Sequence, residues 1–404
     1  MSRTNRTTAS QRRQAGVTLV ELMVAMLLGL MLSGVVFGVL ASFEGRKRTL
    51  TTGNDAEQAG QLAMYKIDRW IRSAGAALPQ AAKFAYGCPL HAVRSNRQLL
   101  PLDAALAAPF DKLNLGKSGV IRLAPVLILP GQKGATVNSE ASDQLVLLAG
   151  VPNGGVAAPF DGAASGAALK LTYAGDFAGG DLALVVDQPD DAGARRPCLL
   201  TQVASDFKPA EAVGGSLPLN GTYYAERVGN ASIDGFTDSA FALRLGAESG
   251  SGAPQFLLLG VGKDNVLYTH DLLQTGAAAQ QAQADSVFEM HALYGIDSDG
   301  DGKVDDWVSP AEGEYGVEAL MAGDDLAADR LQKILAIRIG LLMRTSLLEK
   351  EEKEPITKGP LTLFSDLEAR KFSRTLSGDE QRFRYRTIEQ TVPVRNNLLI
   401  NKDK

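Results

Sequence analysis

The sequence predicts an α+β protein in which one long N-terminal α-helix packs on an enlarged antiparallel β-sheet domain. Three observations support this fold class. An apolar run fills residues 17–43, an apolar stripe at helical spacing follows as far as Gly75, and short apolar runs separated by Gly, Pro, Asp and Asn occupy most of the remaining chain. The first two patterns are typical of a helix, and the third is typical of strands joined by turns.

The run Val17–Phe43 is predicted to form the membrane-spanning first half of the helix. It is 27 residues long, enough to cross a bilayer, and Glu21 is its only charged residue. The leader Met1–Gly16 carries four arginines and no acid, so the positive-inside rule keeps the leader in the cytoplasm. A carboxylate inside a membrane is costly, which makes Glu21 a candidate functional residue.

The helix is predicted to continue beyond the membrane as an amphipathic segment over residues 44–75. Apolar residues recur there at steps of three and four, which places them on one helix face that can pack on a sheet. Gly75 is the predicted end of the helix. The members of the stripe are Ala56, Ala59, Ala63, Ile67, Trp70, Ile71 and Ala74.

Residues 76–404 are predicted to form the β-rich domain, which lies in the periplasm if the leader stays in the cytoplasm. The two cysteines of the chain, Cys88 and Cys198, are both in this domain. One disulfide is the natural interpretation in an oxidising compartment, and two unpaired buried thiols are the alternative, because sequence alone does not show proximity. The charged stretch 349–374 lies between two strong C-terminal strands and is predicted to be a long exposed insertion and a contact surface.

Residues 297–306 are a candidate calcium loop. Carboxylates stand at loop positions 1, 3, 5 and 9, and Gly302 at position 6 allows a sharp turn. Position 12 is Val308 rather than a bidentate glutamate, so the loop is not an EF-hand in architecture. An Asp- and Gly-rich hairpin turn without an ion is the alternative, although mutual repulsion of the acids favours a structural Ca²⁺. The predicted ligands are Asp297, Asp299, Asp301, Asp305 and the carbonyl of Lys303.

Composition and motifs argue against two classes of function. No paired catalytic carboxylates at a recognisable spacing, nucleophile elbow, phosphate-binding loop or Cys/His nucleophile arrangement occurs in the sequence, so an enzyme is not indicated. The formal net charge of −5 becomes about −9 without residues 1–16, because these hold four of the 41 basic residues and none of the 46 acidic ones. That acidity argues against a general nucleic-acid surface, and no nucleic acid is expected as a partner.

The junction Gly16-Val17-Thr18-Leu19-Val20-Glu21 resembles the class III signal of type IV pilins and type II secretion pseudopilins. The resemblance implies that a prepilin peptidase cuts after Gly16 and that Val17, where the family usually has Phe, becomes the methylated N-terminus. It also implies that Glu21 pairs with the N-terminal amine of a neighbouring subunit during assembly. An uncleaved signal-anchor helix with an incidental glutamate is the alternative, and it leaves the carboxylate without a partner at a cost of about 3 kcal/mol.

Further segments narrow the resemblance to the PilW-type minor pilins. They run from Gly16 almost to the C-terminus, and the stretch 349–374 departs from the family pattern as an insertion. The segments that carry the resemblance are Asp55–Met64, Asp68–Gly75, Ser142–Val146, Gly180–Val186, Tyr294–Gly302 and Arg382–Asn396.

Membership of this family implies a minor pilin that takes part in initiating type IV pilus assembly, at or near the fibre tip. The implied location is the bacterial inner membrane with the C-terminal domain periplasmic, and then the pilus fibre at the cell surface. The implied partners are the prepilin peptidase, other minor pilins, the major pilin, the inner-membrane assembly platform and a tip adhesin. Piliation, twitching motility and adhesion are the expected outcomes.

Two other functions remain open from the sequence. A minor pseudopilin of a type II secretion system shares the N-terminal signal, although those of the closest branch are generally much shorter. A membrane-anchored, calcium-dependent tip adhesin is the alternative from a different class. Pilus formation in a deletion strain and ligand binding by the domain beyond the membrane would separate these functions.

Overall fold

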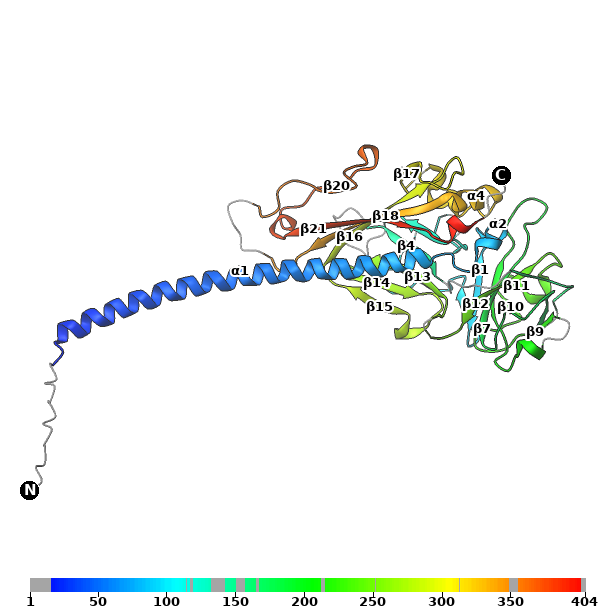
Figure 1. Ribbon diagram of the computed structural model, residues 1–404, viewed down its shortest axis with the longest axis horizontal. Helices are drawn as coiled ribbons and strands as arrows, with labels where there is room; N and C mark the ends of the chain where they lie inside the picture. The colour runs from blue at the N-terminus through cyan, green and yellow to red at the C-terminus, as the bar shows by residue number, and fades with distance from the viewer. Residues whose placement is uncertain are drawn as a thin grey trace, which may run out of the picture. The chain divides into compact units, whose positions relative to one another are not determined.

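The computed structural model describes residues 16–404 except 114, 117–118, 132–141, 150–156, 165–166, 212–214, 251, 312, 349–354 and 401–404. The chain divides into two compact units, Met1–Asn54 and Asp55–Lys404. The first unit contains the N-terminal part of helix α1. The second unit contains the remainder of α1 and all the strands (Figure 1).

Helix α1 runs without interruption from Leu19 to Ser73. Its N-terminal stretch Leu19–Glu44 has a mean hydropathy of 2.5 and none of it is buried, so it is long and apolar enough to cross a membrane. The predicted apolar and amphipathic segments therefore belong to one helix, which ends two residues before Gly75. Gly75 has a φ of +73°, a left-handed conformation that glycine adopts readily at the end of a helix.

Within the second unit, α1 buries the face that the sequence pattern predicts. Ala63, Ile67 and Ile71 are fully buried in the main hydrophobic cluster. Gly60 faces Ile388 and Met343 so closely that a Cβ at this position would lie 2.5 Å from the Ile388 side chain. A larger residue at this position would therefore make the Ile388 and Met343 side chains shift where the helix packs on the sheet.

Three sheets form the body of the second unit (Figure 1). The sheet nearest to Gly60 has four antiparallel strands in the order β17-β16-β18-β21. Their bounds are Asp306–Val308 for β17, Val287–Ile296 for β16, Ile334–Arg344 for β18 and Tyr385–Pro393 for β21. Every residue of β16 is buried, because both faces of this sheet are covered.

The second sheet has five antiparallel strands in the order β15-β14-β13-β4-β3. Their bounds are Gln280–Ala284, Leu267–Asp271, Gln255–Val261, Gln144–Ala149 and Val126–Leu129. Lys66 of α1 donates from Nζ to the Gln283 carbonyl oxygen at 3.2 Å, so the helix also contacts the edge of this sheet.

The third sheet has six strands in the order β2-β1-β8-β7-β12-β5. Their bounds are Arg97–Leu100, Leu90–Arg94, Cys198–Gln202, Asp181–Val186, Phe241–Ala247 and Ala158–Pro159. The pairing of β1 with β8 is parallel, whereas the other pairings of this sheet are antiparallel. The predicted mostly antiparallel α+β fold is therefore confirmed.

Small elements complete the described part of the chain. Three further helices are α2 (Ala82–Ala85), α3 (Val317–Leu320) and α4 (Asp325–Lys333). Three two-stranded ribbons pair β10 (Arg227–Val228) with β11 (Ala231–Ser232), β6 (Ala168–Lys170) with β9 (Ser216–Pro218), and β19 (Leu361–Leu363) with β20 (Phe372–Arg374).

The stretch 349–374 is the predicted exposed insertion, and its residues 349–354 lie outside the described residues. Residues 355–374, here called the strap, are exposed over more than half of their length, but part of the strap packs on the four-stranded sheet. Leu363 and Phe364 are 0% and 1% exposed, and they join a hydrophobic cluster with Phe288 and Leu342 of the four-stranded sheet. The many charges of this stretch masked its apolar residues, which cover the sheet face opposite α1.

Candidate functional site

The N-terminal segment holds the first candidate site. Gly16, Val17 and Thr18 are not helical, and α1 begins at Leu19. The backbone N–H and the hydroxyl of Thr18 both donate to Glu21 Oε2, at 3.1 and 3.0 Å. In return, the Glu21 backbone N–H donates to Thr18 Oγ1 at 3.3 Å. These reciprocal bonds are a capping box.

The capping box determines where the helix starts relative to the predicted cleavage point. Because Thr18 is the N-cap, the Gly16–Val17 bond lies outside the helix, and Val17 is 71% exposed. The Glu21 carboxylate sits in the first turn, where the helix dipole favours a negative charge. The sequence analysis singled out Glu21 but missed the role of Thr18, which the pattern Thr-x-x-Glu before an apolar run could have indicated.

The aspartate loop between β16 and β17 holds the second candidate site. Asp297 follows β16 directly and is fully buried, and its carboxylate accepts the backbone N–H groups of Gly300 and Gly302 at 2.6 and 3.0 Å. Both glycines have a positive φ, of +83° and +87°, which the tight loop requires. The loop thus curls around the Asp297 carboxylate.

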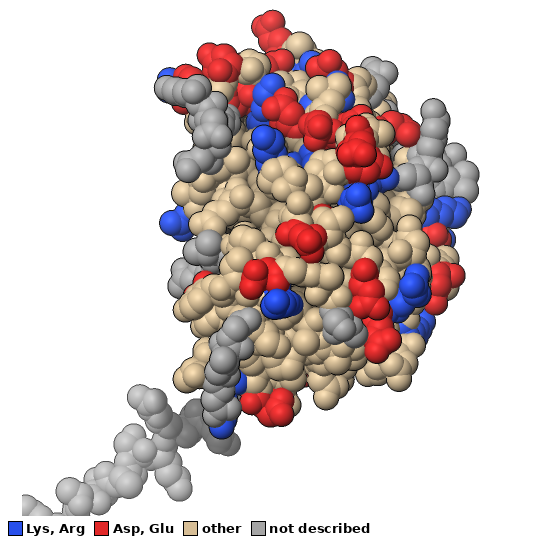
Figure 2. Space-filling model, turned by 90° about the vertical axis from the view of Figure 1, so that its right-hand side faces the viewer, with Lys and Arg blue, Asp and Glu red and all other residues tan. Residues whose placement is uncertain are grey.

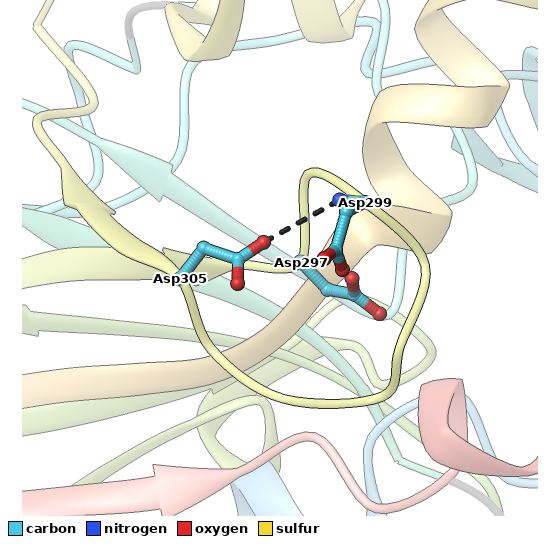
Figure 3. Close-up of side chains that lie close together, drawn as sticks. All are labelled: Asp297, Asp299 and Asp305. Atoms are coloured by element: carbon cyan, nitrogen blue, oxygen red, sulfur yellow. Dashed lines mark hydrogen bonds between the residues drawn. The ribbon is translucent and has the colours of Figure 1, made fainter.

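Three aspartates converge in this loop (Figure 3). One carboxylate oxygen from each of Asp297, Asp299 and Asp305 lies within 4.8 Å of the others. Asp305 Oδ2 accepts the hydroxyl and the backbone N–H of Ser298, at 2.6 and 2.7 Å, and these bonds lower the pKa of Asp305. Three clustered carboxylates are the hard oxygen donors that Ca²⁺ prefers, and backbone carbonyls and water would have to complete six to eight ligands.

Asp301 lies outside the group of three aspartates. Its carboxylate contacts the Lys303 ammonium at 2.6 Å and accepts the Lys303 backbone N–H at 2.8 Å, and these bonds lower the pKa of Asp301. Val308 is the last residue of β17 and offers no side-chain oxygen. The structure therefore brings together three of the four aspartates that the sequence analysis named.

The predicted disulfide is present between Cys88 and Cys198, whose Cα atoms are 5.7 Å apart. Leu90, two residues after Cys88, pairs with Cys198 in the parallel β1–β8 contact, and this explains why the two thiols meet. Both cysteines are buried, and the alternative of two free thiols is excluded. The bond joins the segment between α2 and β1 to the first residue of β8, in the middle of the six-stranded sheet.

The surface charge agrees with the acidic composition. On the face shown in Figure 2, Lys and Arg lie interspersed with Asp and Glu, and no broad basic area covers the described residues of that face.

Two family models match the chain in separate regions. Residues 11–37 match the prokaryotic N-terminal methylation motif, which covers the predicted cleavage point, the capping box and much of the apolar helix. Residues 256–396 match type IV pilus-assembly protein W and include the four-stranded sheet, the aspartate loop and the strap. No curated protein and no solved structure matches the chain.

Both matches point to the same class of protein. They are consistent with a type IV pilin-like protein and indicate a structural pilus component rather than an enzyme. Within that class, about a third of its length, toward the C-terminus, is similar to type IV pilus-assembly protein W. The apolar N-terminal helix and the methylation motif are consistent with membrane anchoring.

Proposed function

We propose that this protein is a minor pilin that helps to initiate type IV pilus assembly, at or near the fibre tip. The observation that carries the proposal is the combination, in one chain, of the N-terminal methylation motif with a segment similar to pilus-assembly protein W. Its partners are the prepilin peptidase, other minor pilins, the major pilin, the inner-membrane assembly platform and a tip adhesin. Piliation, twitching motility and adhesion depend on it.

The N-terminal segment supports a mechanism of assembly in three steps. The peptidase cuts after Gly16, since this bond lies outside the helix, and releases the amine of Val17. The helix then waits in the inner membrane with the second unit in the periplasm, while the Thr18 hydroxyl and N–H hold the Glu21 carboxylate. In the fibre, Glu21 pairs with the N-terminal amine of a neighbouring subunit.

The charge of Glu21 can be tested apart from its capping role. Glutamine also closes a capping box, so Glu21→Gln keeps the helix start but removes the charge. Leaving the neighbour's amine without a partner in an apolar core costs about 3–5 kcal/mol, so pili should be lost while cleavage continues. The measurement is surface piliation by electron microscopy, in a deletion strain that expresses wild type, Glu21→Gln or Glu21→Ala.

The outcome in the deletion strain separates this function from its alternatives. The assembly role is supported if the deletion strain lacks pili, wild type restores them and Glu21→Gln does not. Normal pili in the deletion strain, together with a defect in protein export, would instead indicate a pseudopilin of type II secretion. Normal pili with lost adhesion would indicate a tip adhesin.

We also propose that Asp297, Asp299 and Asp305 hold a structural Ca²⁺. Calcium should raise the melting temperature of the full chain in detergent relative to chelator, because the ion binds the folded loop and not the unfolded chain. Asp299→Asn should abolish the shift, since Asp299 belongs to the converging group. Asp301→Asn is the matched control and should keep it, because Asp301 pairs with Lys303 instead. Equal melting of the wild type with calcium and with chelator would contradict the proposal.

A further inference from the structure

In the described part of the protein, no strand is hydrogen-bonded to the outer edge of β21. β21 is the last strand of its sheet, and its register with β18 is regular from Ala336–Pro393 to Arg344–Tyr385, without a bulge. Natural edge strands are usually short, bulged or blocked, because an open edge is a template for another strand. A regular strand of nine residues is unusual in this position.

Hydrogen bonds beyond the two ends of β21 show which backbone groups point away from β18. The Val394 N–H donates to the Leu335 oxygen, and the Thr345 N–H donates to the Arg384 oxygen. Because the direction alternates along a strand, even-numbered residues of β21 face β18 and odd-numbered residues face outward. Within the described residues, no hydrogen bond uses the backbone N–H of the three central outward residues, which are all exposed: Thr387, Glu389 and Thr391.

Two elements border this edge, one on each side of the sheet. On one side, Gln390 Nε2 donates to Asp68 Oδ1 of α1 at 2.7 Å, so the flank of α1 that carries Asp68 lies over β21. On the other side, the Phe364 N–H of the strap donates to Glu389 Oε1 at 3.0 Å. Figure 1 shows β21 running between α1 and the strap.

The flank of α1 beside this edge carries an exposed aromatic side chain. Residues at steps of three and four share one flank of a helix, so Gln61, Tyr65 and Arg72 lie on the same flank as Asp68. Tyr65 is 64% exposed. An apolar side chain on a strand added to β21 could therefore pack on the Tyr65 ring.

Charged groups of the strap, β18 and β21 on one side, and of α1 on the other, are paired with one another, whereas Arg386 of β21 is exposed. Arg338 contacts Asp366 at 2.6 Å and Glu389 at 3.1 Å, and Arg72 contacts Asp68 at 2.7 Å. A partner needs to supply no charge to these paired groups. It needs main-chain hydrogen-bonding groups and small or apolar side chains, which is the chemistry of strand addition.

We propose that the outer edge of β21 binds an uncharged, extended segment of a neighbouring pilin-like subunit. The segment adds to the sheet as a further strand, bonds to the outward groups of Thr387, Glu389 and Thr391, and places an apolar side chain against Tyr65. This inference rests on the proposed function, because the partner is another subunit of the pilus. It assigns the minor-pilin contact to a defined strand edge.

Two outward prolines test the edge without disturbing the sheet. Pro393 already occupies an outward position, so Thr387→Pro/Thr391→Pro removes two outward N–H groups and keeps the bonds to β18. The matched control is Thr387→Ala/Thr391→Ala. In the deletion strain, the proline pair should give about tenfold fewer pili per cell than wild type or the alanine pair. Immunoblots of the membrane fraction and melting in detergent check that both variants are present and folded.

A second pair of variants tests the same edge if the proline pair does not fold. Tyr65→Ala should also lower piliation, whereas Leu62→Ala should not. Leu62 is another exposed apolar residue of α1, but it lies about 120° from Asp68 around the helix axis, against about 60° for Tyr65. Equal effects of the two substitutions would mean a general helix contact and would overturn the strand-edge proposal.

Amide hydrogen exchange of the full chain in detergent measures directly whether the outward N–H groups of β21 are free. The outward amides of Thr387, Glu389 and Thr391 should exchange rapidly, and the inward amides of Ile388 and Gln390 slowly. Outward amides that are protected at every concentration would mean that the chain itself occupies the edge, and this result would overturn the proposal. Normal pili with the proline pair in a strain whose deletion abolishes them would overturn the strand addition and leave the minor-pilin role. Normal pili in the deletion strain would overturn both the strand addition and the minor-pilin role.

Discussion

At the scale of single residues, buried polar groups create most of the testable consequences. Asp271, at the end of β14, is buried enough that desolvation raises the pKa of its carboxyl to about 6, although the Leu273 and Phe256 N–H groups donate to Oδ1. Its ordinary pKa is 3.8, so the folded state holds this proton more tightly than the unfolded state. Stability therefore falls as the pH rises from about 4 through 6.

Replacing Asp271 with asparagine should remove this pH dependence. Asp271→Asn keeps an oxygen acceptor for the two N–H groups and cannot lose a proton, so it should be about 1–2 kcal/mol more stable than wild type at pH 7. At pH 4 the two proteins should melt at the same temperature. Thermal melting between pH 4 and 8 checks this, with the exposed Asp238→Asn as control. A difference that stays constant across this range would contradict the assignment.

At the scale of elements, the strap depends on a buried ion pair. Arg374 of β20 donates from Nε to Glu289 of β16 at 3.0 Å, and from Nη2 to Glu380 at 2.9 Å. Glu289 is fully buried, and its other carboxylate oxygen lies 3.3 Å from His291 Nε2. The His291 ring stacks on Phe372 of the strap at 3.7 Å. These contacts join the strap to the middle of the four-stranded sheet.

Removing one partner of this pair should be far more harmful than removing both. Arg374→Ala leaves the Glu289 charge buried without its guanidinium, which should lower the free energy of unfolding by about 3–5 kcal/mol. Glu289→Met/Arg374→Met replaces the pair with apolar side chains and should recover most of this loss. Denaturant unfolding of the three proteins in detergent measures the difference. A double variant no more stable than Arg374→Ala would mean that the pair itself, rather than the unpaired charge, determines stability.

At the scale of the whole molecule, the disulfide links distant parts of the second unit. Cys88 and Cys198 are 110 residues apart in sequence, so the bond restricts a long loop of the unfolded chain. The same unit contains both α1 from Asp55 onward and the segment similar to pilus-assembly protein W. The second unit must therefore stay folded for α1 from Asp55 onward and the segment similar to pilus-assembly protein W to contact other pilus components.

Loss of the disulfide should destabilise the second unit by about 2–5 kcal/mol. Cys88→Ala/Cys198→Ala should melt at a lower temperature than the wild type. A reductant should lower the melting temperature of the wild type only. The reductant acting equally on both proteins would show that the effect does not come from this bond. The measurement is thermal melting of the full chain in detergent, with and without reductant.

Local patterns determined several features of this protein from the sequence alone. The apolar run, the basic leader and Glu21 predicted the N-terminal helix and the pilin resemblance, because hydrophobicity and charge act through neighbouring residues. The apolar stripe from Ala56 to Ala74 predicted the buried face of α1 for the same reason. The β-rich domain followed from turn residues between short apolar runs, and the α+β class is confirmed.

Long-range contacts decided the rest, and only the tertiary structure shows them. The meeting of Cys88 with Cys198 depends on the β1–β8 pairing, and the burial of the strap depends on Glu289, 85 residues before Arg374. The separation of Asp301 from the other aspartates depends on how the loop curls around Asp297. The open edge of β21 depends on strand order. The sequence alone therefore determined the long helix, its stretch apolar enough to cross a membrane and the β-rich remainder, whereas folding decided which side chains meet, because distant contacts leave no periodic pattern in the chain.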